Sequence, residues 1–155
     1  MLTDVLLVDP NAGVLVTTIR RALATVAEVE LCAGFRGARA RLLTKQPDLL
    51  VTNLRLGEYN GLHLVVLAAS KGTRCVVYAA QDDLVLAREV QRLGAFYERL
   101  SRLPFALPSY LTKTLPERDR RDVIVLDRRR LSFRGGRRST DRYKLAVNSG
   151  VPSVH

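Results

Sequence analysis

Short runs of consecutive apolar residues alternate along much of this chain with segments in which apolar residues recur at intervals of three and four. Residues 5–8 (VLLV) are the first run, which ends at the polar loop 9–11. An uninterrupted apolar run is typical of a parallel β-strand buried on both faces. Residues 12–26 show the helical spacing, which predicts a helix with one buried face. The apolar residues of that predicted face are Val14, Leu15, Ile19, Leu23 and Val26.

The same alternation continues to about residue 113. Further strands are predicted over residues 28–32, 48–53, 74–79 and 95–98. Further helices are predicted over residues 36–44, 62–70, 84–93 and 105–113. Strands that alternate with helices at this spacing form parallel sheets with right-handed crossovers. The pattern therefore predicts an α/β fold, a small doubly wound domain whose sheet is covered by helices on both faces.

The pattern stops after residue 115, where the composition also changes. Residues 1–115 carry 14 basic and 10 acidic side chains, whereas residues 116–155 carry 11 basic and 5 acidic ones and few apolar residues that could form a core. We therefore predict a domain over residues 1–115 and a basic, largely disordered tail over residues 116–155. The run 123–126 (VIVL) is an exception, because it is β-prone and could join a sheet edge or a partner strand.

The excess of basic residues in the tail suggests an acidic partner. Arg134, Arg137 and Arg138 belong to an arginine-glycine run, with Phe133 before it and Tyr143 after it. Segments of this composition contact phosphate backbones and stack on bases, so nucleic acid is a candidate partner. The alternative is a solvated tail that only keeps the protein soluble, and the sequence leaves both interpretations open.

Other functional classes lack their signals in this sequence. The longest apolar stretch is far shorter than the ~20 residues of a membrane span, and no signal peptide precedes the first strand, so we expect a cytoplasmic protein. Cys32 and Cys75 fall in strands too far apart in the expected sheet to pair, which predicts buried reduced thiols. The GxSxG, GxxxxGK[ST] and HExxH motifs are absent, and His63 has no second ligand at a metal-binding spacing. We therefore expect no enzymatic activity, no cofactor and no metal site.

Candidate site residues stand where the predicted parallel strands end, because ligands of open α/β sheets bind among the loops at these carboxyl ends. The residues at these ends are Asp9 and Pro10 after the first strand, Asn53 and Ala79 at the ends of the third and fourth, and Arg99 or Ser101 after the fifth.

Four segments resemble the receiver domain of two-component response regulators, the CheY-like family, over residues 4 to about 114. Residues 5–11 (VLLVDPN) resemble its first strand and acidic pair, and residues 47–62 (PDLLVTNLRLGEYNGL) resemble, without a gap, the segment around its phosphoacceptor. Residues 75–83 (CVVYAAQDD) resemble its fourth strand and the next loop, and residues 94–97 (GAFY) the approach to its fifth strand. The resemblance implies a flavodoxin-like, doubly wound sheet of five parallel strands in the order 2-1-3-4-5.

The positions that carry the family's chemistry depart from its pattern. A receiver accepts a phosphoryl group on an aspartate, binds Mg²⁺ through that aspartate and an acidic pair, and contacts the phosphoryl group through a hydroxyl and a lysine. Here Asn53 stands at the phosphoacceptor position, Pro10 follows Asp9 in the acidic pair, and Ala79 replaces the hydroxyl residue. A carboxamide is a poor nucleophile, and one carboxylate is a poor ligand set for Mg²⁺. The resemblance therefore implies a pocket that has lost aspartyl phosphorylation.

The lysine position is ambiguous in the sequence. Arg99 fills it if the loop after the fifth strand is shortened, and Ser101 fills it if the alignment has no gap. In the first case the Arg99 guanidinium could pair with Asp9, which is a hypothesis that a structure tests directly.

The resulting functional prediction is a response-regulator-like signalling protein of a phosphorelay that binds partners without being phosphorylated. In the resembling family, the fourth helix, fifth strand and fifth helix form a partner surface, whose candidates here are Arg88, Arg92, Phe96 and Tyr97. The expected partner is a signalling kinase, an output protein or a second copy of the chain. The alternative is a nucleic-acid-binding regulator that uses the arginines of the tail.

Overall fold

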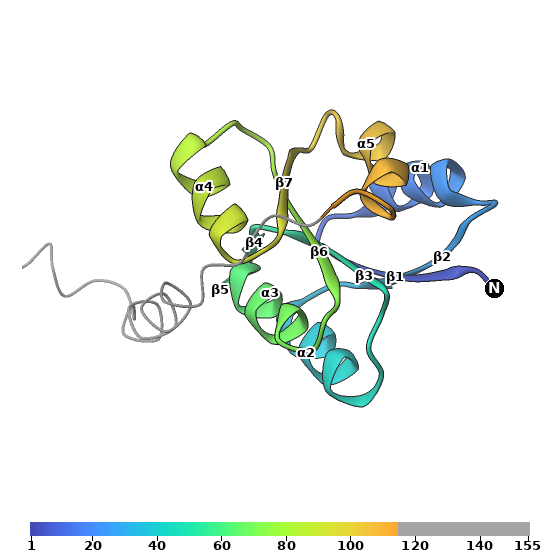
Figure 1. Cartoon of the computed structure of the whole chain (residues 1–155), viewed down its shortest axis with the longest axis horizontal. Helices are drawn as coiled ribbons and strands as arrows, with labels where there is room; N and C mark the ends of the chain where they lie inside the picture. The colour runs from blue at the N-terminus through green and yellow to red at the C-terminus, as the bar shows by residue number, and fades with distance from the viewer. Residues whose placement is uncertain (115–155) are drawn as a thin grey trace, which may run out of the picture. The chain divides into compact units, whose positions relative to one another are not determined.

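The computed structural model describes residues 1–114 of the chain. Five of its strands form one parallel sheet in the order β2-β1-β3-β6-β7 (Figure 1). These strands are β1 (Thr3–Val8), β2 (Ala27–Cys32), β3 (Leu49–Asn53), β6 (Arg74–Ala79) and β7 (Phe96–Arg99). Numbered as the sequence predicted them, the strands follow the order 2-1-3-4-5, so the flavodoxin-like fold is confirmed.

Helices cover both faces of the sheet (Figure 1). On one face, α1 (Gly13–Leu23) and α5 (Leu103–Tyr110) pack against each other and share a core with the strands. On the other face, α2 (Phe35–Thr44) and α3 (Leu62–Ala69) lie side by side. The fourth helix, α4 (Leu84–Arg92), packs against the edge strand β7. Because the inner strands are covered on both faces, residues 5–8 and 49–51 have no exposed surface, as their apolar runs predicted.

The first helix is shorter than predicted and buries only part of the predicted face. It ends at Leu23, and its buried residues are Val16, Ile19 and Leu23. Val14 is 85% exposed and Val26 is also exposed, so the predicted face was wrong at these two positions. At about 100° per residue, Val14 lies on the side of the helix opposite to Val16 and Leu23.

Two local features after β3 and β7 also differ from the prediction. A short hairpin of β4 (Arg55–Leu56) and β5 (Tyr59–Asn60), which the pattern did not predict, follows β3. Gly57 adopts a φ of 68° in its turn, a conformation that glycine reaches without steric cost. The last helix begins at Leu103 rather than at residue 105. Pro104 lies in its first turn, where the backbone N–H that proline lacks would have no intrahelical acceptor.

Cys32 and Cys75 form no disulfide, as predicted, and lie on β2 and β6, three strands apart. Cys75 is buried, whereas Cys32, at the end of the edge strand, is only half-buried. Burial together with the nearby Glu30 carboxylate raises the pKa of the Cys32 thiol, so this side chain stays protonated at neutral pH.

Several predictions concern residues outside the described part of the chain. They are the disordered tail over residues 116–155, the β-prone run 123–126 and the nucleic-acid contact through Arg134, Arg137 and Arg138. Within residues 1–114, every helix lacks the length or the apolar character that crossing a membrane requires.

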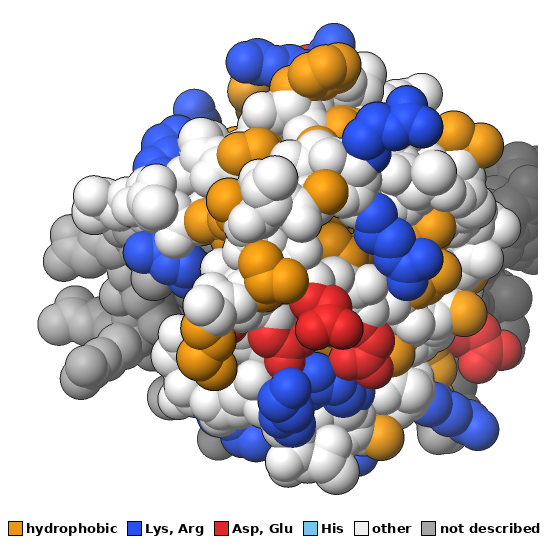
Figure 2. Space-filling view, turned by 90° about the vertical axis from the view of Figure 1, so that its right-hand side faces the viewer, with side chains coloured by type: hydrophobic (Ala, Val, Ile, Leu, Met, Phe, Trp, Pro, Cys, Tyr) orange, Lys and Arg blue, Asp and Glu red, His pale blue; other side chains and the backbone are white. Residues whose placement is uncertain are grey.

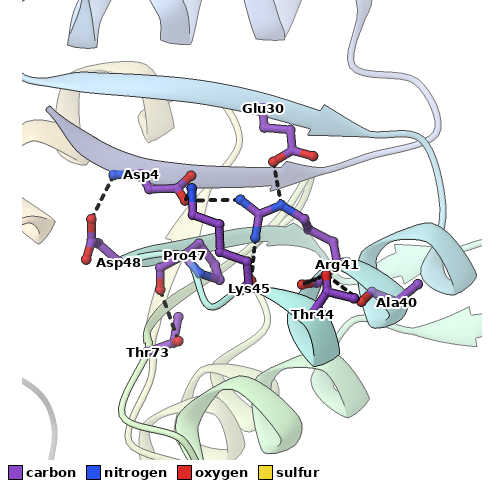
Figure 3. A network of polar contacts seen from close by, with 9 residues as sticks. All are labelled: Asp4, Glu30, Ala40, Arg41, Thr44, Lys45, Pro47, Asp48 and Thr73. Atoms are coloured by element: carbon purple, nitrogen blue, oxygen red, sulfur yellow. Dashed lines mark hydrogen bonds and ion pairs between the residues drawn. The ribbon is translucent and has the colours of Figure 1, made fainter.

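At the amino end of the sheet, a network of ion pairs connects β1, β2 and α2 (Figure 3). The Arg41 guanidinium donates to the Asp4 carboxylate at 3.0 Å and to the Glu30 carboxylate at 2.6 Å. It also donates to the backbone carbonyl of Lys45, whose ammonium group lies 3.1 Å from the Asp4 carboxylate. The Asp4 N–H donates to the side chain of Asp48 at 2.8 Å. The edge strand β2 is therefore held by side-chain charges as well as by its backbone ladder.

The same balance of charges is visible on the surface. Figure 2, which views the side on which β2 and the N-terminus lie, shows acidic side chains gathered directly beside basic ones. Burial alone would raise the pKa of Asp4, but the hydrogen bonds and charges of Lys45 and Arg41 outweigh it. They hold the pKa of Asp4 below its ordinary value of 3.8.

Asp4→Asn is expected to lower the free energy of unfolding by about 1 kcal/mol at neutral pH, because it removes the charge that Arg41 and Lys45 stabilise. Since folding lowers the pKa of Asp4, its charge stabilises the fold above the unfolded pKa, and this contribution is lost as the pH falls through the lower folded pKa. Urea unfolding of both proteins at neutral pH and near pH 3 measures the effect.

Asp82→Asn is the matched control, because it removes the partner of Arg99 in an exposed ion pair, and it should cost less than Asp4→Asn. An Asp4→Asn loss that is equally large in acid would show that the charge of Asp4 does not carry the effect.

Candidate functional site

The carboxyl ends of β1, β3 and β6 bring three side chains into one row. In the parallel register, Val8 is level with Thr52, and Asn53 is level with Tyr78. Asp9 follows Val8 directly, so Asp9, Asn53 and Tyr78 lie side by side across three neighbouring strands. Tyr78 belongs to the core shared with α1 and α5, which places the row on that face of the sheet.

The Asp9 side chain is buried, with 5% of the residue exposed, and it accepts hydrogen bonds from three protein groups. Its Oδ1 accepts the backbone N–H of Asn11 at 2.8 Å. Its Oδ2 accepts both the side-chain amide of Asn53, at 3.2 Å, and the hydroxyl of Tyr78. Charged acceptors are costly to bury unless such donors replace their hydration, so these three bonds account for a carboxylate at this depth.

The Asn53 carboxamide joins Asp9 to the loop that follows β3. Its Oδ1 accepts the backbone N–H of Arg55 at 3.0 Å, which leaves the NH₂ group to donate to Asp9. An aspartate in the same place would turn an anionic oxygen toward the Asp9 carboxylate, and two like charges at this distance repel. Asparagine is therefore the side chain that satisfies both neighbours.

Tyr78 is a site residue that the sequence analysis missed. The residue has no exposed surface. Burial, followed by the hydrogen bond and charge of Asp9, raises the pKa of Tyr78 far above its ordinary value, so the hydroxyl keeps its proton and remains a donor. A signal existed in the sequence, because a tyrosine inside a fully buried strand needs a partner for its hydroxyl.

The backbone around Asn53 is fixed by a close approach of α3. Gly61, directly before that helix, donates its N–H to the carbonyl of Leu54 at 2.8 Å. A Cβ atom at Gly61 would lie 2.3 Å from the carbonyl oxygen of Asn53 and 2.8 Å from the hydroxyl oxygen of Thr52. Glycine is therefore required here for space and not for its backbone angles, which are ordinary helical ones.

Two of the predicted pocket residues bring no polar side chain to the row. Pro10 is exposed beside Asp9 and has neither a carboxylate nor an N–H. Ala79 is half-buried next to Tyr78 and carries only a methyl group. The positions predicted to lack a second carboxylate and a hydroxyl, Pro10 and Ala79, thus lie beside the row of three side chains.

The hypothesis that Arg99 pairs with Asp9 is wrong. The Arg99 guanidinium is exposed and binds both carboxylate oxygens of Asp82, with Nε 2.9 Å from Oδ1. Asp82 lies in the loop between β6 and α4, so this pairing draws the guanidinium away from the row of three. The other candidate for the lysine position, Ser101, is exposed in the turn before α5.

Mg²⁺ does not fit the donor set of this pocket. It needs near-octahedral oxygen ligands, usually with carboxylates and phosphate oxygens among them. Here Asp9 is the single carboxylate in the row, its two oxygens accept protein hydrogen bonds, and the Asn53 oxygen already accepts the Arg55 N–H. In the described part of the chain, no group of three or more His, Cys, Asp or Glu side chains is placed to hold a metal ion.

The four residues of the predicted partner surface differ in their exposure. Arg88 and Arg92 are exposed on α4. Tyr97 is half-buried, and its hydroxyl donates to the carbonyl of Gln81 at 2.8 Å. Phe96, in contrast, is buried against the ring of Tyr110, with the ring centroids 4.6 Å apart, so it belongs to the core and not to the surface.

The fold is similar to those of solved response regulator receiver domains. The CheY-like receiver domain protein of Methanospirillum hungatei has a TM-score of 0.61 and 19% identity, covering 72% of this chain and 94% of that one. A response regulator of Burkholderia pseudomallei, solved with a phosphorylated aspartic acid, a calcium ion and citrate, has a TM-score of 0.64 and 19% identity, covering 72% and 67%. The chemotaxis response regulator CheY4 of Vibrio cholerae has a TM-score of 0.59 and 18% identity, covering 71% and 99%.

At this level of identity the similarity establishes the receiver-type fold alone. No protein-family model matches the chain, and no curated protein matches its sequence. A fold alone does not define a function, so the function of this chain depends on the residues at the carboxyl ends of its strands.

Gly61→Ala is expected to destabilise the fold by about 2 kcal/mol, because the added methyl group must push back the backbone of Asn53. Gly37→Ala is the control, since a Cβ there meets nothing within 4 Å and alanine favours the helix α2. Chemical denaturation measures both. A Gly61→Ala protein as stable as the Gly37→Ala protein would show that the loop after β3 yields easily.

Proposed function

We propose that this chain is a response-regulator-like signalling protein of the two-component type that binds protein partners without being phosphorylated. The receiver-type fold supports the signalling role. The main support for the loss of phosphorylation is the hydrogen bonding of Asp9. This residue, at the carboxyl end of β1, accepts hydrogen bonds from Asn53 and Tyr78. In a phospho-accepting domain this pocket would present carboxylates to a cation and to a phosphoryl group.

The residues of this pocket lack the groups that phosphoryl transfer needs. The amide of Asn53 is neutral and already donates to Asp9, so it is neither an anionic ligand nor a nucleophile. Phosphoryl transfer depends on positioned groups that neutralise the charge of the transferred phosphate. Ala79 offers no hydroxyl for this purpose, and the Arg99 guanidinium is bound to Asp82. Binding, and not group transfer, is the activity that remains.

The surface of α4, β7 and α5 is the proposed partner site. Both helices pack against β7, the edge strand of the sheet. Leu84 and Val85, in the first turn of α4, are 78% and 69% exposed, and Phe105, in the first turn of α5, is 86% exposed. Contiguous exposed apolar side chains mark interaction surfaces, and Leu84 and Val85 are adjacent in the chain. Arg88 adds a positive charge to this surface, which favours a partner with acidic residues.

The partner that fits this role is a signalling kinase, an output protein or a second copy of the chain. A two-component module of this kind works in the cytoplasm, where we place it. Because the pocket already holds its own hydrogen-bonded arrangement, binding would be constitutive and regulated by the amount of partner.

Incubation with Mg²⁺ and acetyl phosphate is expected to leave the full chain unmodified, as measured by its intact mass. The Asn53→Asp protein is expected to remain unmodified as well, because restoring one carboxylate leaves the hydroxyl, the lysine and the second acidic residue missing.

A receiver domain that retains its aspartate and lysine is the positive control for the reagent. Phosphorylation of the unaltered chain would refute the proposed function. Phosphorylation of Asn53→Asp alone would show that the surrounding residues are still competent and that a single substitution accounts for the loss.

A second candidate function rests on the charge of residues 116–155, which carry 11 basic and 5 acidic side chains. We propose that this segment contacts nucleic acid through Arg134, Arg137 and Arg138. Binding of duplex DNA to the full chain should then weaken as salt is added, and replacing the three arginines by alanine should reduce the slope of log K against log salt by up to about 3. A slope that the triple variant leaves unchanged would remove these residues as the contact.

A further inference from the structure

The Tyr78 side chain reaches across a neighbouring strand. Tyr78 is on β6, Asp9 follows β1, and β3 lies between them in the sheet. Neighbouring strands are about 4.8 Å apart, so the phenol must pass over the Asn53 position to place its hydroxyl on Asp9. An aliphatic side chain at position 78 could not span this distance. The hydrogen bond to Asp9 therefore depends on both the length and the hydroxyl group of the tyrosine side chain.

We propose that Tyr78 bars divalent cations from Oδ2 of Asp9 by placing its hydroxyl hydrogen where a cation would bind that oxygen. This inference rests on the proposed function in one respect. It takes this pocket as the counterpart of the cation-binding pocket of a receiver domain. It adds one residue of this chain to the two causes already described, which are the missing phosphoacceptor and the missing second carboxylate.

The hydrogen bonds around Asp9 support this assignment. Oδ2 accepts two donors, the Tyr78 hydroxyl and the Asn53 amide, while Oδ1 accepts the Asn11 N–H. A Mg²⁺ ion must approach a carboxylate oxygen to about 2.1 Å, and on Oδ2 the two donors already occupy both lone pairs. Donors and cations compete for the same lone pairs, and here the donors are part of the fold.

Tyr78 cannot easily give way to a cation. The residue is completely buried in the core shared with α1 and α5, so its ring has no solvent-facing position to which it could rotate. The Asn53 amide is held through the Arg55 N–H at its other end. Moving either donor would leave a buried polar group without its partner, which is costly.

Tyr78→Phe removes only the hydroxyl and keeps the ring in the core. The test is a titration of the full chain with Mg²⁺ alone, followed through the amide NMR signals of Asn11 and Asn53. At roughly 10 mM Mg²⁺ the unaltered protein should show no shift at these amides, whereas Tyr78→Phe, which still has a single carboxylate, should show weak shifts there that grow with the Mg²⁺ concentration. Tyr97→Phe, which loses a hydroxyl bonded to the Gln81 carbonyl, is the matched control and should behave as the unaltered protein does.

Equal affinity of Tyr78→Phe and the unaltered chain for Mg²⁺ would overturn the inference, as would saturable binding to the unaltered chain. A second measurement covers the case in which Tyr78→Phe fails to fold. The hydroxyl proton of Tyr78 in the unaltered protein, bonded to a buried carboxylate, should give an NMR signal that persists when Mg²⁺ is added, and its loss would overturn the inference. Neither result depends on labelling by acetyl phosphate, so the proposed function can stand if this inference falls.

Discussion

The hydrogen bonds that Asn53, Tyr78 and Asn11 donate to Asp9 determine how the carboxyl end of this sheet is built. A carboxylate at this depth must recover from protein donors what it loses in hydration. Each donor is in turn fixed by another element. The Asn53 carboxamide is held by the Arg55 N–H, the Tyr78 ring by the core under α1 and α5, and the backbone of Asn53 by the close approach of Gly61.

This arrangement reverses the electrostatic character that a phospho-accepting pocket needs. Such a pocket concentrates carboxylates, whose repulsion a cation relieves. Here one charge remains and three neutral donors surround it, so no like charges have to be held together. Arg99 binds Asp82, in the loop before α4, and not Asp9. The single charge of the pocket is thus satisfied by neutral donors, while the basic residue at its rim pairs with Asp82.

Much of the fold was predictable because it depends on local patterns. The inner strands are buried on both faces, so their apolar runs predicted them almost to the residue, and the positions of Asp9 and Asn53 followed from strand ends. The face of α1 was misassigned because several apolar residues compete along that segment, and only the packing shows that Val16 points inward and Val14 outward. Phe96 was misassigned for a similar reason, since an aromatic residue on an edge strand can face either the core or the solvent.

The central hydrogen bonds were harder to predict because they depend on register between strands distant in sequence. Nothing near position 78 indicates that its hydroxyl reaches Asp9, 69 residues earlier. The Arg99–Asp82 pair likewise depends on the path of the loop before α4. The central property proposed for this pocket is that it no longer accepts a phosphoryl group. The most direct test is a titration of the full chain with Mg²⁺ and beryllofluoride, a phosphoryl mimic, followed by amide NMR. Unchanged signals at Asp9, Asn53 and Ala79 are predicted, and saturable shifts confined to these residues would contradict the account.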